Sequence, residues 1–253
     1  MKIFYHTSLF LLSFISFNAY SQIAIGGEEK KEKSDSLIKL TNEIAPKREL
    51  KGSTEIFAGI NCSSSFRVLS INGDLYGKPL GERANESKLN TWSYAIGFRN
   101  YLTKNFAIEG GISFLKNGEG YKFKTTDSTY NYQTTYAYIA MPIKVYYAIG
   151  EEIRFLVGGG IIPQTFNQYK KEQQWITHSG SNETSTIKTK NNYNSFVVSA
   201  CLDASIQIRY SKSWSIYVTP EYRWQLISSN MKTSAYNHYA RTAGVSFGFV
   251  YQL

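Results

Sequence analysis

The segment from Trp214 to Leu226, WSIYVTPEYRWQL, alternates two kinds of residue almost without interruption. Apolar residues and one proline occupy every second position, and mostly Ser, Thr, Glu, Arg and Gln stand between them. A β-strand places successive side chains on opposite faces, so the segment predicts a strand with one apolar and one polar face. Trp214 and Trp224 lie ten positions apart, and a tilted strand of about ten residues spans the roughly 25 Å apolar band of a membrane β-barrel. The segment therefore predicts one strand of such a barrel.

The first 21 residues predict an export signal that is removed. Lys2 supplies a positive charge, Ser8 to Phe17 is apolar but too short to cross a bilayer, and Ala19 and Ser21 are small residues spaced for cleavage before Gln22. A buried helix or an uncleaved anchor is the alternative. Beyond Phe17 no stretch reaches the ~18 apolar residues of a membrane helix. An exported chain of this kind belongs to the periplasm, the exterior or a membrane barrel.

The rest of the chain divides into a flexible periplasmic segment, 22–50, and one barrel domain, 51–253. The first contains the charged run EEKKEKSDS and little apolar periodicity. In the second, alternation and turn residues predict an all-β fold, an eight-stranded antiparallel transmembrane β-barrel with up-and-down connections. The predicted strands are Ser53–Phe66, Leu89–Leu102, Phe106–Lys116, Gln133–Ala148, Ile153–Tyr169, Tyr193–Tyr210, Trp214–Ser228 and Tyr239–Leu253.

The predicted connections alternate in length. Three of them, 103–105, 149–152 and 211–213, are tight turns, whereas 67–88, 117–132, 170–192 and, to a lesser degree, 229–238 are long. Outer-membrane barrels keep short turns in the periplasm and long loops outside. A soluble up-and-down barrel, which composition alone would also allow, has no reason to gather its long loops at one end. The pattern therefore favours the membrane barrel.

Prolines and glycines interrupt three of the predicted strands. Pro142, Pro163 and Pro220 each remove a backbone donor that lipid cannot replace, so we expect a bulge or a local change of register at each. The run of glycines at 158–160 likewise indicates a bend or bulge.

Charged residues fall on the inward-facing positions of the predicted strands. They are Arg99, Glu109, Lys144, Asp203, Arg209, Glu221 and Arg223, with Arg154 a further candidate. Charges inside a membrane are costly unless they are paired or hydrated. They predict either a small polar channel or a set of salt bridges that fills the lumen. We favour the salt bridges, because eight strands leave a lumen barely wide enough for side chains.

Aromatic residues mark the two predicted membrane interfaces. The predicted girdles contain Trp92, Tyr147, Trp214, Trp224 and Tyr251, with Trp214 on the periplasmic side and Trp224 on the outer side. Near the ends of the long loops stand Tyr130, Tyr132, Tyr169 and Trp175. These four would either bind a partner or anchor the barrel at the interface, and we favour the anchoring role.

The formal net charge of +9 comes mainly from residues outside the strands. The basic residues of the N-terminal segment and of 170–192 can contact anionic surfaces such as outer-membrane lipid and lipopolysaccharide, and the alternative is a solvated tail and loop. We expect no nucleic-acid partner for an exported chain. Cys62 and Cys201 are expected on strands that are not neighbours, one pointing outward and one inward, so we expect two free thiols.

Patterns for catalysis are weak in this sequence. We find no metal-ligand spacing, phosphate-binding loop or nucleophile motif. Two histidines remain once the predicted signal is removed, His178 and His238. No nucleophile with an orienting group can be placed beside either of them. We therefore expect no enzyme, no cofactor and no metal.

Three features carry a resemblance to a known family. The strand from Tyr138 to Tyr147, YIAMPIKVYY, the aromatic C-terminal strand from Val245 to Leu253 and the predicted cleavage before Gln22 resemble the small outer-membrane β-barrels typical of Bacteroidetes, often labelled PorT-like or porin family. The likeness covers most of 52–253 and implies an eight-stranded barrel similar to OmpA and OmpX, without a single activity. The chain departs from it at Leu253, where such barrels commonly end in an aromatic assembly signal.

From these features we expect a monomeric outer-membrane barrel with a structural or interaction role, whose external loops bind a partner that the sequence does not name. A narrow channel for small solutes or ions is one alternative. An accessory role in protein secretion, implied by the PorT-like resemblance, is another.

Overall fold

The computed structural model describes residues 51–71, 83–177 and 179–253. The predicted signal peptide, 1–21, and the predicted periplasmic segment, 22–50, lie outside these residues. A short 3-10 turn, η2 (Arg83–Asn85), precedes the second strand. The strands of the described residues are β1 (Thr54–Ile71), β2 (Glu86–Tyr101), β3 (Phe106–Lys124), β4 (Ser128–Ala140), β5 (Ile143–Ile149), β6 (Ile153–Thr177), β7 (Asn182–Thr189), β8 (Phe196–Arg209), β9 (Trp214–Gln225) and β10 (Tyr236–Gln252).

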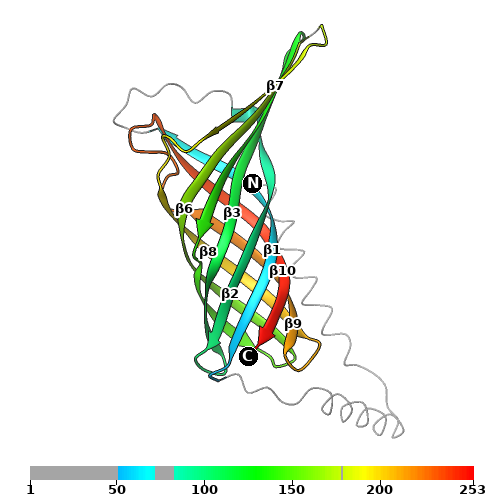
Figure 1. The fold of residues 1–253 in the computed structure, drawn as a ribbon, viewed down its shortest axis with the longest axis vertical. Helices are drawn as coiled ribbons and strands as arrows, with labels where there is room; N and C mark the ends of the chain where they lie inside the picture. The colour runs from blue at the N-terminus through cyan, green and yellow to red at the C-terminus, as the bar shows by residue number, and fades with distance from the viewer. Residues whose placement is uncertain (1–50, 72–82, 178) are drawn as a thin grey trace, which may run out of the picture. The chain divides into compact units, whose positions relative to one another are not determined.

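These strands close into a barrel by antiparallel pairing (Figure 1). β1 pairs with β2 on one side and with β10 on the other, so the first and last strands seal the wall. β4 and β5 both pair with β3 and with β6, and therefore occupy one position in that wall. β7 pairs with β6 alone. The ten strands of the described residues thus make the eight wall positions that the sequence predicts, plus one extra strand.

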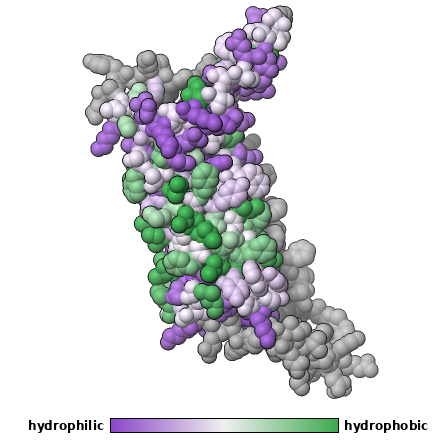
Figure 2. All heavy atoms as spheres, in the orientation of Figure 1, coloured by the Kyte–Doolittle hydropathy of each residue, from purple (hydrophilic) through white to green (hydrophobic). Residues whose placement is uncertain are grey.

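Strand alternation separates a lipid-facing side from a lumen. In β8 and β9, Leu202 and Val218 are exposed, whereas Asp203, Ser205 and Ser215 between or beside them are buried. The same inversion of ordinary burial holds around the wall, where large apolar side chains are the exposed ones. Figure 2 shows these side chains as an apolar belt between two polar ends. A surface of this kind is stable in lipid and not in water.

Among the described residues, no helix is both long and apolar enough to cross a membrane.

The three prolines do not disturb the register, which corrects our expectation of bulges or shifts there. Pairing continues evenly from Ala140 to Ile143 across Met141 and Pro142, and Met141 N donates to the Pro163 carbonyl at 2.9 Å. β9 likewise runs through Pro220, which stands opposite Val245. The wall therefore tolerates the lost donors as gaps in an otherwise regular ladder, and the main visible effect is the division of one long strand into β4 and β5.

The glycines at 158–160 also remain in regular register with β5 and β8 rather than forming a bulge. Their role is to provide space. A Cβ on Gly158 would lie 2.5 Å from Cδ1 of Tyr146, so the missing side chain gives this lumen tyrosine its place. The bulge in β6 lies higher up, where Ala137 faces Gln168 and Tyr138 faces Phe166, which leaves Asn167 as an extra residue.

Part of the sheet continues beyond the apolar belt as an extension that we call the blade. It consists of 117–135 in β3 and β4 and of the described residues 168–177 and 179–189 in and beside β6 and β7, and it rises above the rim in Figure 1. We expected loops over most of these residues, because the alternation predicts a third strand that ends at Lys116 and a fifth that ends at Tyr169. The strands in fact reach Lys124 and Thr177, and β7 adds a fourth strand to the blade.

The two faces of the blade reverse the polarity of the barrel wall. The face that continues the lipid-facing side, the outer face, is polar and includes Lys122, Asn131, Gln174 and Thr184. The inner face continues the lumen side and is rich in aromatic residues. A lipid-embedded sheet requires the opposite arrangement, so the blade stands in water.

Candidate functional site: the closed lumen and the blade

The lower lumen contains an ionic group centred on Glu55. Its carboxylate accepts hydrogen bonds from Arg154 Nη1 at 3.0 Å and from Arg99 Nη1 at 3.4 Å. Arg99 also donates to Glu109 Oε2 from Nε at 3.1 Å and from Nη2 at 2.6 Å, a fork that fixes the guanidinium. Tyr101 adds its ring beneath the Arg154 guanidinium, 4.9 Å from centroid to Cζ. All five side chains are buried.

A second ionic group lies next to it and is centred on Lys144. The ammonium donates to Asp203 Oδ2 at 2.8 Å and to Glu221 Oε2 at 2.7 Å. Glu221 is bound on its other oxygen by Arg223 Nε at 3.0 Å. The Tyr146 hydroxyl donates to Asp203 Oδ2 at 2.9 Å. Lys144 thus joins β5 to β8 and β9 across the lumen.

A third group lies nearer the outer rim, and sequence reasoning did not single it out. Arg67 binds Glu86 at 2.5 Å and Glu119 at 3.5 Å. Glu119 also accepts from the Tyr136 hydroxyl at 3.4 Å and lies 3.7 Å from His238 Nε2. Inward parity in β1 and β3 is the signal that could have found Glu55, Arg67 and Glu119, because each shares a face with buried neighbours.

The charges of the first two groups cancel. Their members are Arg99, Lys144, Arg154 and Arg223 on the basic side, and Glu55, Glu109, Asp203 and Glu221 on the acidic side. Between them lies a cavity of about 60 Å³ lined by Asn61 and Tyr217 among others. A space of this size holds a few water molecules at most. Arg209, which we predicted for the same set, lies at the end of β8 and is only partly buried.

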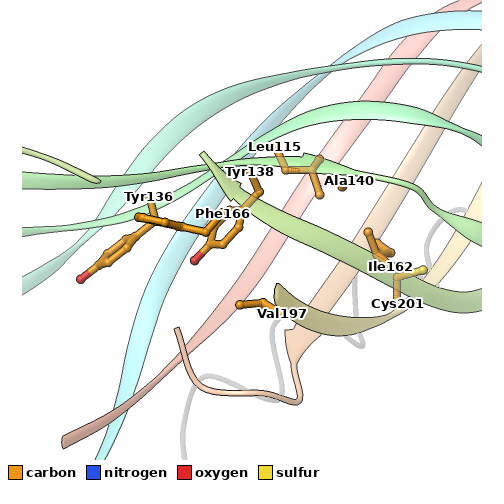
Figure 3. Close-up of a cluster of buried hydrophobic side chains, with 8 residues drawn as sticks. All are labelled: Leu115, Tyr136, Tyr138, Ala140, Ile162, Phe166, Val197 and Cys201. Atoms are coloured by element: carbon orange, nitrogen blue, oxygen red, sulfur yellow. The ribbon is translucent and has the colours of Figure 1, made fainter. Parts of the chain in front are cut away.

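Above the first two ionic groups the lumen contains a buried apolar cluster, which reaches the third group at Tyr136. Figure 3 shows its members converging from β3, β4, β6 and β8: Leu115, Tyr136, Tyr138, Ala140, Ile162, Phe166, Val197 and Cys201. Tyr138 is fully buried, and its hydroxyl forms a 2.8 Å hydrogen bond with Ser229 Oγ. Tyr193 packs against Phe166 with a centroid distance of 4.9 Å. The inward charges in the sequence predicted a polar lumen, and this apolar layer was not predicted.

The predicted girdle residues lie on the lipid-facing side. Trp92, Tyr147, Trp214 and Tyr251 are exposed, and Trp224 is partly exposed. Trp214 and Tyr251 pack together on β9 and β10, 5.0 Å apart at their centroids, and both lie near the end of the barrel that carries the tight turns. Side chains with an apolar body and a polar tip suit the boundary between lipid and water.

The four loop aromatics have a different position from the one we favoured. Tyr130, Tyr132, Tyr169 and Trp175 stand on the inner face of the blade or on its continuation toward the lumen, so they cannot serve as lipid-facing anchors. Tyr132 stacks on Tyr121 at 4.9 Å, and Lys171 Nζ lies 4.3 Å from the Tyr132 ring centroid. Burial raises the pKa of Tyr132 to about 12, so its hydroxyl stays a neutral donor.

The outermost aromatic side chains of this face remain accessible. Trp175 packs against Tyr130 at 5.4 Å yet is 47% exposed, and Phe123 beside them is 37% exposed. Ile187 on β7 is exposed as well. The inner face of the blade therefore presents an apolar surface to water at a site where lipid does not explain it.

The two cysteines are free. Cys62 on β1 is partly exposed and Cys201 on β8 is buried, on strands that do not pair. The thiol of Cys201 lies near Asp203 and Glu221, with one potential ligand atom of each within 4.8 Å of the others. The Lys144 ammonium already bridges these two carboxylates, so a metal ion would have to displace a cation that fits.

Comparisons with known proteins find similar solved structures of outer-membrane proteins. No protein-family model and no curated protein matches the sequence. Among solved structures, OprG from Pseudomonas aeruginosa is similar over 81% of this chain and 97% of its own, with 10% identity and a TM-score of 0.43. Ail, the attachment invasion locus protein of Yersinia pestis, is similar over 79% and 99%, with 12% identity and a TM-score of 0.34. These likenesses concern the fold alone.

Neisserial surface protein A gives a similar result, with 11% identity, 78% and 98% coverage and a TM-score of 0.33. The closed wall and the exposed apolar belt together describe a membrane β-barrel. The polar blade stands beyond one end of the belt, and the tight turns close the other.

Proposed function

We propose that this protein is a non-conducting outer-membrane barrel that holds the blade outside the cell and binds a partner through the blade's inner face. The closed lumen is the observation that carries the proposal. Neutral ionic groups and an apolar cluster occupy the space through which a solute would pass. The barrel then acts as a rigid mount, and recognition belongs to the extension it carries.

Partner binding is supported by the chemistry of the inner face. Trp175, Phe123 and Ile187 are exposed, and Gln173 and Lys171 add polar groups between them. Exposed aromatic side chains surrounded by polar neighbours are typical of interaction surfaces. Among the described residues of this face, no nucleophile stands beside a general base, so we propose a binding role and no catalysis.

Two experiments test these two halves separately. Single-channel recording of the refolded protein in a planar bilayer should show no stable openings; clear, reproducible openings would refute the closed lumen. A photo-crosslinking residue at Trp175 should give a discrete adduct in intact cells, whereas the same residue at Ile176, on the outer face of the same strand, should not. Equal labelling at both positions would refute the inner face as the binding surface.

A narrow channel is the second candidate, and the cavity of about 60 Å³ among the ionic groups is the observation that favours it. The bilayer recording decides between the two. The PorT-like resemblance would add an accessory role in protein secretion. A deletion strain that exports its cargo normally would exclude that role.

A further inference from the structure

A row of lysines begins at the upper edge of the apolar belt and continues onto the outer face of the blade. On β3 they are Lys116, Lys122 and Lys124, which all share the outward parity of Phe114 and Ile112 below them. Lys188 on β7 stands on the same face. Lys116 marks the boundary itself, because its Nζ lies 5.5 Å from the centroid of the Phe114 ring.

The face is basic because its charges are unbalanced. Within the described part of the blade, the acidic side chain of the outer face is Glu172, which pairs with Lys170 at 2.7 Å. Lys122, Lys124 and Lys188 remain in addition to that pair, and all three are exposed. Glu183 lies on the inner face and Asp127 lies in the turn at the tip. This separation contrasts with the lumen, where acidic and basic side chains cancel.

The spacing of the row suits a ligand that extends away from the bilayer. From Lys116 to Lys124 the strand covers eight residues, about 26 Å along its axis before tilt. The neighbouring outer-face residues on β4, Thr129, Asn131, Gln133 and Thr135, supply hydroxyl and amide groups beside the lysines. Ammonium groups beside neutral hydrogen-bonding groups match phosphates attached to sugars.

We propose that the outer face of the blade binds the phosphate groups of the glycolipid that forms the outer leaflet, with Lys116, Lys122 and Lys124 as its principal contacts. The lipid is the occupant that the position favours, because the row begins where the apolar belt ends and faces the surrounding bilayer rather than the barrel axis. Anionic membrane surfaces attract such clusters of basic residues. The inference rests on the proposed placement of the blade outside the cell.

The test measures binding of purified lipopolysaccharide to the refolded full-length protein. The variant Lys116→Gln/Lys122→Gln/Lys124→Gln removes three charges from the row. Its matched control, Lys51→Gln/Lys104→Gln/Lys212→Gln, removes three charges at the end with the tight turns. We expect binding about tenfold weaker or more in the first variant and within about twofold of the parent in the control. A change of gel mobility on boiling, equal to that of the parent protein, verifies that each barrel has folded.

Two further arms identify the ligand chemistry. Lipopolysaccharide stripped of its phosphates should bind the parent protein as weakly as the intact lipid binds the row variant, and inorganic phosphate should compete only at far higher concentration. Equal losses in both triple variants would reduce the effect to net charge and overturn the proposal. Undiminished binding of the dephosphorylated lipid would also overturn it, and tighter binding of an acidic peptide would assign the face to a protein.

Neither outcome depends on the lumen or on Trp175. A failure of this inference is therefore distinguishable from a failure of the proposed function, which the bilayer recording and the crosslinking address.

Discussion

Replacing Glu55 with Gln should be among the most damaging single changes in the barrel. The carboxylate is fully buried and is the anionic partner of Arg154, at 3.0 Å, while it also accepts from Gln207 at 3.3 Å on the same oxygen. Glutamine keeps the shape but replaces one acceptor oxygen with a donor that faces guanidinium groups. Breaking a buried ion pair by removing one partner costs about 3–5 kcal/mol.

Arg154 is the arginine whose charge would be left without a compensating carboxylate. Arg99 keeps its fork with Glu109, so its charge stays compensated. Arg154 keeps the Tyr101 hydroxyl, whereas its Nε and Nη2 have no hydrogen-bond partner among the described residues. We therefore expect Glu55→Gln to destabilise the barrel by about 3–5 kcal/mol and the double variant Glu55→Gln/Arg154→Met to recover at least ~1 kcal/mol of it.

The assay is guanidinium-driven unfolding of the refolded full chain in lipid vesicles, followed by tryptophan fluorescence. The exposed pair Lys104–Glu151, 3.4 Å apart, provides the control, since Lys104→Gln should change the free energy of unfolding by less than ~1 kcal/mol. A cost below ~1 kcal/mol for Glu55→Gln, or simple addition of the two single costs in the double variant, would refute the view that these charges neutralise one another.

Three further predictions follow from the same structure. Gly97→Ala should lower the free energy of unfolding by about 1–3 kcal/mol, because the added Cβ would lie 2.3 Å from the Gly110 carbonyl oxygen. In the control, Gly110→Ala, the added Cβ lies 3.4 Å from the Phe98 ring and should change that free energy little. Equal unfolding midpoints for the two variants would contradict this prediction. In single-tryptophan variants, brominated lipid should quench Trp214 and leave Trp175 bright, and strong quenching of Trp175 would place the blade in the bilayer. In the folded protein, a charged maleimide should leave the buried Cys201 unmodified until denaturant is added, and rapid labelling before that would show an open lumen.

The barrel itself was predictable because lipid and lumen impose opposite demands on neighbouring residues. The alternation around Val218 and Asp203, and the tight turn before Trp214, follow directly from that demand. The blade was not predictable in the same way. Once strands leave the bilayer, alternation no longer marks an apolar outer side, so Lys122 and Tyr130 read as loop residues although they continue β3 and β4.

Many of the charged residues of the lumen were predicted, but their partners were not. Inward charges such as Lys144 and Glu109 stand out in an apolar pattern, but the identity of each partner depends on how strands distant in sequence meet across the barrel. Glu55 and Arg154 are 99 residues apart. The apolar layer around Tyr138 and Phe166 was missed because apolar residues are expected on the lipid side, and parity alone does not reveal how they fill the interior.

Asn167, the extra residue of β6, has a consequence for how such appendages arise. Below it, even-numbered side chains such as Arg154 and Leu156 point inward; above it, odd-numbered ones such as Lys171 and Trp175 do so. One inserted residue thus lets a single strand keep its inward-facing side chains on even positions within the barrel and on odd positions in the blade. Deleting Asn167 would exchange the inner and outer faces of the upper part of β6. Conversely, a single insertion of this kind is a short evolutionary step from a plain barrel to one that displays a binding surface.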